Sequence, residues 1–150
     1  MNKNILLILC LIFSISATAC EPNDAPQTKS IISDTTTIPL GGNTFIEPKG
    51  VPNDAVSENG ITTWSSEKST FNIYFKNEKT RTSALYIALL PGEFSSKIKC
   101  TLGGQSQVVQ LTKFQKNPVF IGNFVMTSGY QKLVLESISK ETNSVAAISS

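Results

Sequence analysis

The sequence predicts an all-β domain, built as an antiparallel sandwich or barrel of short strands. From Thr36 onward, apolar and polar residues alternate in short runs and do not recur at helical spacing. In residues 70–76, the clearest run, Phe71, Ile73 and Phe75 share one face. Turn residues separate the runs at regular intervals, and seven or more such strands are typical of a sandwich or barrel.

Six further runs are predicted as strands because they combine alternation with flanking Gly, Pro, Asn or Ser residues. Residues 83–90 (SALYIALL) would also suit a turn of helix, but Pro91-Gly92 and the short length favour a strand. Gly103-Gly104 is expected to close a hairpin. These six runs are residues 61–65, 83–90, 97–102, 107–112, 119–126 and 130–138.

Residues 143–150 (NSVAAISS) resemble the beginning of one more strand. The chain stops there without a terminating turn. We therefore expect either a short last strand or a sequence that is part of a longer protein.

Residues 1–20 are predicted to be an export signal. Lys3 supplies a positive charge, and the apolar run from Ile5 to Ile15 is too short to span a bilayer, which takes about 20 helical residues. The segment ending at Cys20 resembles a bacterial lipobox, which predicts lipidation of that cysteine. Ordinary cleavage after Ala17-x-Ala19 is the alternative.

The predicted organisation behind the signal is a flexible tether over residues 21–35 and one domain over residues 36–150. The tether contains two prolines and little periodicity. Loss of Lys3 with the signal changes the formal net charge from +2 to +1, so no nucleic-acid partner is expected. Lipid on Cys20 would make the protein a membrane-anchored lipoprotein of the bacterial envelope, either periplasmic or at the surface. The oligomeric state is not predicted.

Catalysis is not expected in this domain. The chain has no histidine, the usual general base near neutral pH and the commonest metal ligand. Neither a Gly-x-Ser-x-Gly sequence nor an interpretable acid pair is present. Cys100 is the single cysteine beyond Cys20 and is expected to be a buried, inert thiol.

Three residues are candidates for ligand binding. Trp64, the only tryptophan, is either a platform for a sugar ring or a core residue. Tyr74 is expected on the exposed face of its strand, opposite Phe71, Ile73 and Phe75, and Asn72 on the same face would supply amide hydrogen bonds.

No cofactor is predicted. A structural calcium is the one metal considered, because carboxylates and backbone carbonyls bind it, but no calcium-loop pattern is present. The acids considered are Glu47, Asp54, Glu58 and Glu67.

Four segments resemble a bacterial family named DUF5077. They are residues 38–43 (IPLGGN), 60–64 (GITTW), 97–104 (KIKCTLGG) and 129–140 (GYQKLVLESISK). The resemblance implies a jelly-roll β-sandwich similar to galactose-binding and carbohydrate-binding modules, often followed by a second domain. Together with the residues above, it leads us to expect a non-catalytic exported module that binds a polysaccharide or presents a substrate. The alternatives are a structural or protein-interaction lipoprotein, and an accessory domain of an enzyme whose catalytic domain lies elsewhere.

Overall fold

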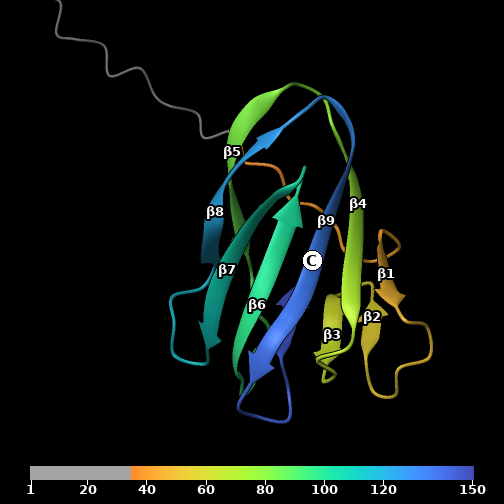
Figure 1. Ribbon diagram of the computed structural model, residues 1–150, viewed down its shortest axis with the longest axis vertical. Helices are drawn as coiled ribbons and strands as arrows, with labels where there is room; N and C mark the ends of the chain where they lie inside the picture. The colour runs from red at the N-terminus through yellow and green to blue at the C-terminus, as the bar shows by residue number, and fades with distance from the viewer. Residues whose placement is uncertain (1–34) are drawn as a thin grey trace, which may run out of the picture. The chain divides into compact units, whose positions relative to one another are not determined.

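The computed structural model describes residues 35–150, in which ten strands form three antiparallel sheets. Its larger sheet has the order β1-β4-β9-β6-β7, and Figure 1 shows β4, β9, β6 and β7 side by side. The strands are β1 (Thr44–Glu47), β4 (Thr70–Asn77), β9 (Gly129–Lys140), β6 (Ser95–Leu102) and β7 (Gln105–Thr112).

A second layer, made of two smaller sheets, packs against this sheet. One is a three-stranded sheet of order β10-β3-β2, and the other is a ribbon of β5 and β8. Backbone hydrogen bonds join them, since Leu90 N donates to Ala147 O and Ser149 N donates to Ala88 O. The strands are β2 (Ala55–Ser57), β3 (Gly60–Trp64), β5 (Arg81–Ile87), β8 (Val119–Met126) and β10 (Ala146–Ser149).

The core lies between the two layers and follows from the alternation along each strand. Apolar side chains at every second position face inward, and the larger sheet contributes Phe71, Ile98 and Leu135, all at most 1% exposed. The second layer contributes Ile61 and Phe124, neither with any exposed surface. This arrangement confirms the predicted all-β, sandwich-like fold, whereas the jelly-roll detail stays a prediction.

Two side-chain amides replace strand partners where the layers end. Asn117 Nδ2 donates to Leu89 O and its Oδ1 accepts from Leu89 N, both at 2.9 Å. Gln105 Nε2 donates to Val125 O at 3.0 Å, and Val125 N donates back to Gln105 Oε1 at 3.2 Å. Each amide supplies one donor and one acceptor, as the backbone of a neighbouring strand would. It therefore satisfies an N–H and a C=O that no strand pairs.

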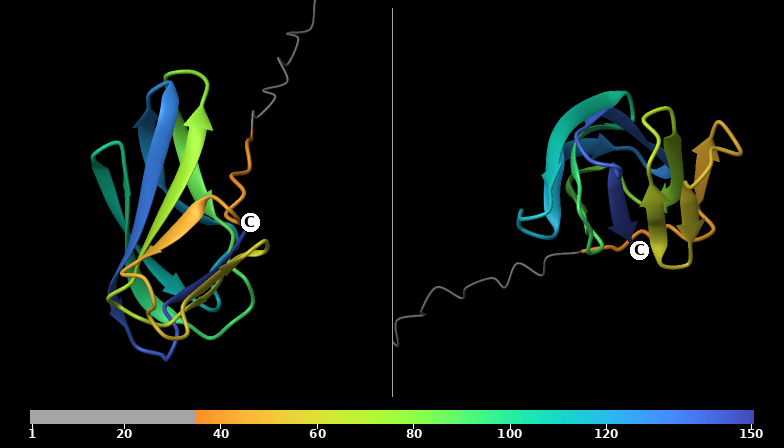
Figure 2. Two further views of the ribbon diagram at one scale, coloured as in Figure 1. Left: turned by 90° about the vertical axis from the view of Figure 1, so that its right-hand side faces the viewer. Right: turned by 90° about the horizontal axis from the view of Figure 1, so that it is seen from below.

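The predicted strands all occur, with ends displaced by a few residues. The run predicted at residues 83–90 corresponds to β5, which spans Arg81–Ile87, and Gly103-Gly104, with φ angles of 57° and 77°, closes the β6–β7 hairpin as expected. The C-terminal residues form β10, which is paired on both sides, with β3 and with the segment around Leu89. The segment that leads into β1 passes close to this end, because Leu40 N donates to Ser150 Oγ at 3.1 Å (Figure 2). Strands β1 and β2 were not predicted.

The export signal, Cys20 and residues 21–34 of the predicted tether lie outside the described residues. Within residues 35–150, no helix is long and apolar enough to cross a membrane.

Cys100 is part of the core. It faces inward from β6 with no exposed surface, and burial raises the pKa of its thiol to about 12 because the thiolate would be desolvated. We therefore expect iodoacetamide to label Cys100 at least about 100-fold more slowly in the folded protein than in urea at pH 8. Mass analysis of the tryptic peptide that begins at Cys100 reads out this site alone. Equal labelling rates in the two states would contradict the burial.

The same pKa shift makes stability depend on pH in a defined direction. The pKa is raised in the folded state relative to the unfolded value of 9.0. The buried thiol therefore makes its full contribution to the free energy of unfolding below about pH 9. That contribution decreases as pH rises from about 9 toward 12, since the unfolded chain then releases a proton that the folded chain retains.

Candidate functional site

Trp64 is a core residue, and the expectation that it offers a sugar platform does not fit its position. Its side chain has no exposed surface and packs on Phe71, with ring centroids 4.8 Å apart. Its Nε1 donates to the carbonyl oxygen of Ser66 at 3.0 Å, which satisfies the indole inside the fold. An indole without exposed surface cannot stack on a ligand.

Asn72 is likewise buried, at 1% exposure, so the expectation of an exposed amide on the face of Tyr74 also needs correction. Its neighbours explain the burial. Asn72 lies in register with Phe45 of β1 on one side and with Val134 of β9 on the other, and larger apolar side chains therefore flank it. In this arrangement its amide is not available to a ligand.

Tyr74 is exposed, as its place in the alternation predicts, with 40% of its surface accessible. It forms an edge-to-face pair with Phe45, which is 56% exposed, at a centroid distance of 5.8 Å. Lys132 Nζ lies 5.7 Å from the centroid of the Tyr74 ring. We call Phe45 and Tyr74 the aromatic pair; they come from adjacent strands and stand on the outer face of the larger sheet.

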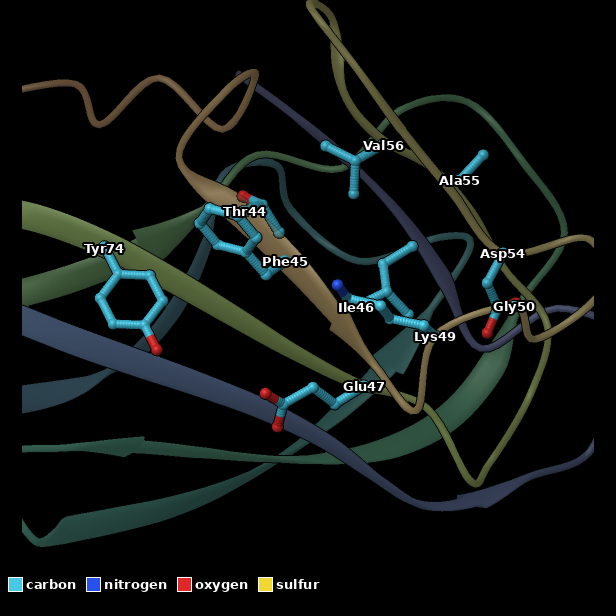
Figure 3. Close-up of a pocket in the computed structure, with 10 residues that line it drawn as sticks. All are labelled: Thr44, Phe45, Ile46, Glu47, Lys49, Gly50, Asp54, Ala55, Val56 and Tyr74. Atoms are coloured by element: carbon cyan, nitrogen blue, oxygen red, sulfur yellow. The ribbon is translucent and has the colours of Figure 1, made fainter.

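An open groove of about 850 Å³ runs beside the aromatic pair, between the edge strand β1 and the edge strand β2. Figure 3 shows Phe45 and Tyr74 side by side at one end and Ala55 and Val56 on the β2 side. The lining residues are Thr44, Phe45, Ile46, Glu47, Lys49, Gly50, Asp54, Ala55, Val56 and Tyr74.

Asp54 holds the loop side of this groove. Its Oδ1 accepts hydrogen bonds from the N of Ser65 at 2.6 Å, the Oγ of Ser65 at 2.8 Å and the N of Ser66 at 3.2 Å. Its Oδ2 is buried and has no hydrogen-bond partner among the described residues. The groove thus combines an aromatic wall, an aliphatic wall and the charged side chains of Glu47 and Lys49, which is the composition of a small-molecule or sugar site.

The acids considered for calcium do not gather at one place. Glu47 and Asp54 line the groove, whereas Glu67 accepts a hydrogen bond from Lys140 N at 3.0 Å and does not line the groove. Residues 35–150 contain no group of three or more His, Cys, Asp or Glu side chains placed to hold a metal ion.

A second exposed aromatic pair lies on the β5–β8 ribbon. Tyr86 and Phe120 are 54% and 49% exposed, and their centroids lie 5.3 Å apart. The cross-strand neighbours Ala84 and Asn123 continue this face without a charge. Neither ring lines the groove described above, which distinguishes this pair from Phe45 and Tyr74.

Comparison with protein families places the chain. The family model described as "Domain of unknown function (DUF5077)" matches residues 38–150. The chain belongs to the DUF5077 family. The match covers all ten strands of this DUF5077 domain, from β1 to β10. Neither the curated proteins nor the solved structures include a match to the chain.

Sequence reasoning missed Phe45 of the DUF5077 domain because β1 was not recognised. The available signal was the alternation Thr44-Phe45-Ile46-Glu47 directly after the Gly41-Gly42 turn. Four residues are too few for a secure assignment, since a strand of that length is identified mainly by its partner. Here the partner is β4, which brings Phe45 beside Asn72 and near Tyr74.

Proposed function

We propose that this domain is a non-catalytic exported module that binds carbohydrate, with Phe45 and Tyr74 as its platform. The observation that carries the proposal is an exposed aromatic pair beside a groove of about 850 Å³ that Glu47 and Lys49 also line. Substrate presentation, in which the bound glycan is held for another protein or domain, is the same chemistry in a larger assembly.

Stacking supplies the attractive force in this proposal. Sugar rings have apolar C–H faces, and Tyr and Phe bury such faces while losing little side-chain entropy. The two rings are already in contact with each other, at 5.8 Å between centroids, so their positions are largely set before a ligand arrives.

Polar groups along the groove supply orientation. Glu47 and Lys49 line it from β1 and the following loop, and Asp54 holds its loop side with three hydrogen bonds to Ser65 and Ser66. Sugar hydroxyls require donors and acceptors for specificity, and the Lys49 ammonium and the Glu47 carboxylate are of these kinds.

The cellular setting of the proposal comes from the sequence. Lipid on Cys20 would anchor the domain to a membrane of the bacterial envelope, and residues 21–35 would act as a tether with a reach of about 20 Å. From such a tether the groove can turn toward envelope or environmental glycans.

Affinity electrophoresis of the full chain in mild detergent, through gels containing single soluble polysaccharides, tests the proposal. We expect at least one polysaccharide to retard the protein, and Tyr74→Ala or Phe45→Ala to weaken binding at least about tenfold, as loss of a central aromatic anchor does.

Tyr86→Ala is the matched control, because it removes a tyrosine of similar exposure from the opposite layer. Circular dichroism verifies that each variant is folded. If no polysaccharide retards the folded protein, or if Tyr86→Ala weakens binding and Tyr74→Ala does not, the proposed platform is wrong.

The alternative of a protein-docking envelope lipoprotein is supported by a different surface. Tyr86, Phe120 and Val125 are each about half exposed on the β5–β8 ribbon, and aromatic side chains are enriched at protein interfaces. The electrophoresis separates the two proposals, since docking through this surface does not require any polysaccharide to bind.

A further inference from the structure

Two tyrosines and two lysines form a regular arrangement next to the aromatic pair. Tyr74 and Lys76 are alternate residues of β4, and Tyr130 and Lys132 are alternate residues of β9. The register places Tyr74 opposite Lys132 and Lys76 opposite Tyr130. Because alternate residues share a face, all four side chains stand on the outer face of the larger sheet. We call these four residues the tyrosine–lysine square.

Every member of the square is exposed, and Tyr130 is 85% exposed. The ion pairs of residues 35–150 engage other lysines, Lys99 with Glu136 and Lys113 with Glu93. Lys76 and Lys132 take part in neither pair. Their ammonium groups are therefore available to an external anion.

The two lysines occupy a diagonal of the square, a position where cross-strand neighbours are about 7–8 Å apart. The other diagonal is formed by the two tyrosines, so the square itself contains no acidic side chain. An anionic group placed over the square would therefore lie between two ammonium groups and next to two phenol hydroxyls, all of which can donate hydrogen bonds.

The contact between Lys132 and Tyr74 links the square to the carbohydrate platform. Lys132 Nζ lies 5.7 Å from the ring centroid, so a sugar that stacks on Tyr74 has an ammonium group beside it. A cation–π contact at an exposed site is weak, and the ammonium can therefore turn toward a ligand.

We propose that the carbohydrate bound at Phe45 and Tyr74 is an acidic polysaccharide, whose carboxylate or sulfate groups are held by Lys76 and Lys132. This inference rests on the proposed function. The net charge of the whole chain is only +2, so a preference for anions has to come from this local pair and not from a general attraction.

The test compares an acidic polymer with its own neutral form and adds a second acidic polymer that carries sulfate. The full chain in mild detergent is run through gels containing polygalacturonate, the same polymer after its carboxyl groups have been reduced, or a sulfated galactan. We expect polygalacturonate or the sulfated galactan to retard the protein at least about tenfold more strongly than the reduced polymer at low salt. The two acidic polymers distinguish a carboxylate from a sulfate ligand.

Lys76→Gln and Lys132→Gln are each expected to weaken binding of the acidic polymer about tenfold at low salt and to reduce its salt dependence. Lys116→Gln is the matched control. It removes the same charge from an exposed lysine in the β7–β8 loop, so its mobility in an empty gel matches that of the other two variants.

The outcomes separate this inference from the proposed function. If Tyr74→Ala abolishes binding but the reduced polymer binds as well as the acidic one, or Lys76→Gln and Lys132→Gln behave as Lys116→Gln, the site binds neutral carbohydrate and the lysine inference is wrong. If these polymers do not bind but another polysaccharide does, the acidic-glycan inference alone fails, and if no polysaccharide binds, both proposals fail. If both lysine variants instead lose binding to phosphatidylglycerol vesicles while no polysaccharide binds the parent, the square contacts a membrane surface and the acidic-glycan inference is overturned.

Discussion

Replacing Trp64 with alanine is expected to lower the free energy of unfolding by about 3–5 kcal/mol, as deletions of large buried aromatic side chains do. Trp64 has no exposed surface and contacts Phe71 of the opposite layer at 4.8 Å between centroids. The substitution therefore opens a cavity between the layers. It also leaves the Ser66 carbonyl without its Nε1 donor. Because small domains have a total stability of about 5–15 kcal/mol, this change threatens folding itself.

Urea unfolding of the full chain, followed by far-ultraviolet circular dichroism, measures this effect without relying on the tryptophan signal. Trp64→Phe keeps an apolar ring in the site and should show a clearly smaller loss. Tyr86→Ala, which removes a half-exposed ring, should show less still. A loss below about 1 kcal/mol for Trp64→Ala would mean that the indole does not join the two layers.

Gly60→Ala is the second substitution for which we expect a large effect, a loss of at least about 3 kcal/mol. Gly60 begins β3 with φ of 116°, a conformation that side-chain-bearing residues rarely adopt. A Cβ there would lie 2.1 Å from Ile148 O and 2.9 Å from Ser150 N, both backbone atoms of the C-terminal strand and its end. Since backbone cannot rotate away as a side chain does, β10 has to move from β3.

Gly104→Ala separates the two causes of this effect. Gly104 also has a positive φ, 77°, but nothing lies within 4 Å of a Cβ built there. For Gly104→Ala the free energy of unfolding should fall only by the conformational cost of a left-handed residue, about 1–2 kcal/mol. Hydrogen exchange of the β10 amides provides the structural readout, and we expect faster exchange in Gly60→Ala alone. Equal losses for the two variants would show that the approach of β10 to β3 is not tight.

The strands that the sequence predicted well are those in which apolar and polar residues alternate several times in succession. In β4 the run Phe71, Ile73, Phe75 identified both the strand and the inward face, and Tyr74 was correctly expected to be exposed. In the β6–β7 hairpin the Gly103-Gly104 pair identified the turn as well as the strands. These features depend on residues adjacent in sequence, which is why they can be read without a structure.

The candidate site was predictable only in part. Sequence indicated Tyr74, but Phe45 becomes its partner because β1 pairs with β4. Trp64 had two possible orientations, and packing on Phe71 decides between them. Asn72 follows the alternation yet is buried, because Phe45 and Val134 flank it from neighbouring strands.

By itself the sequence determined the all-β class, most strand positions, the turns and the face on which each long strand is apolar. The tertiary structure alone decided the strand order, the groove between β1 and β2, and the alignment of Tyr74 and Lys76 with Lys132 and Tyr130. The physical reason is that alternation is a local property with a period of two residues. Register and pairing depend on contacts between strands such as β4 and β9, which are more than fifty residues apart in the chain.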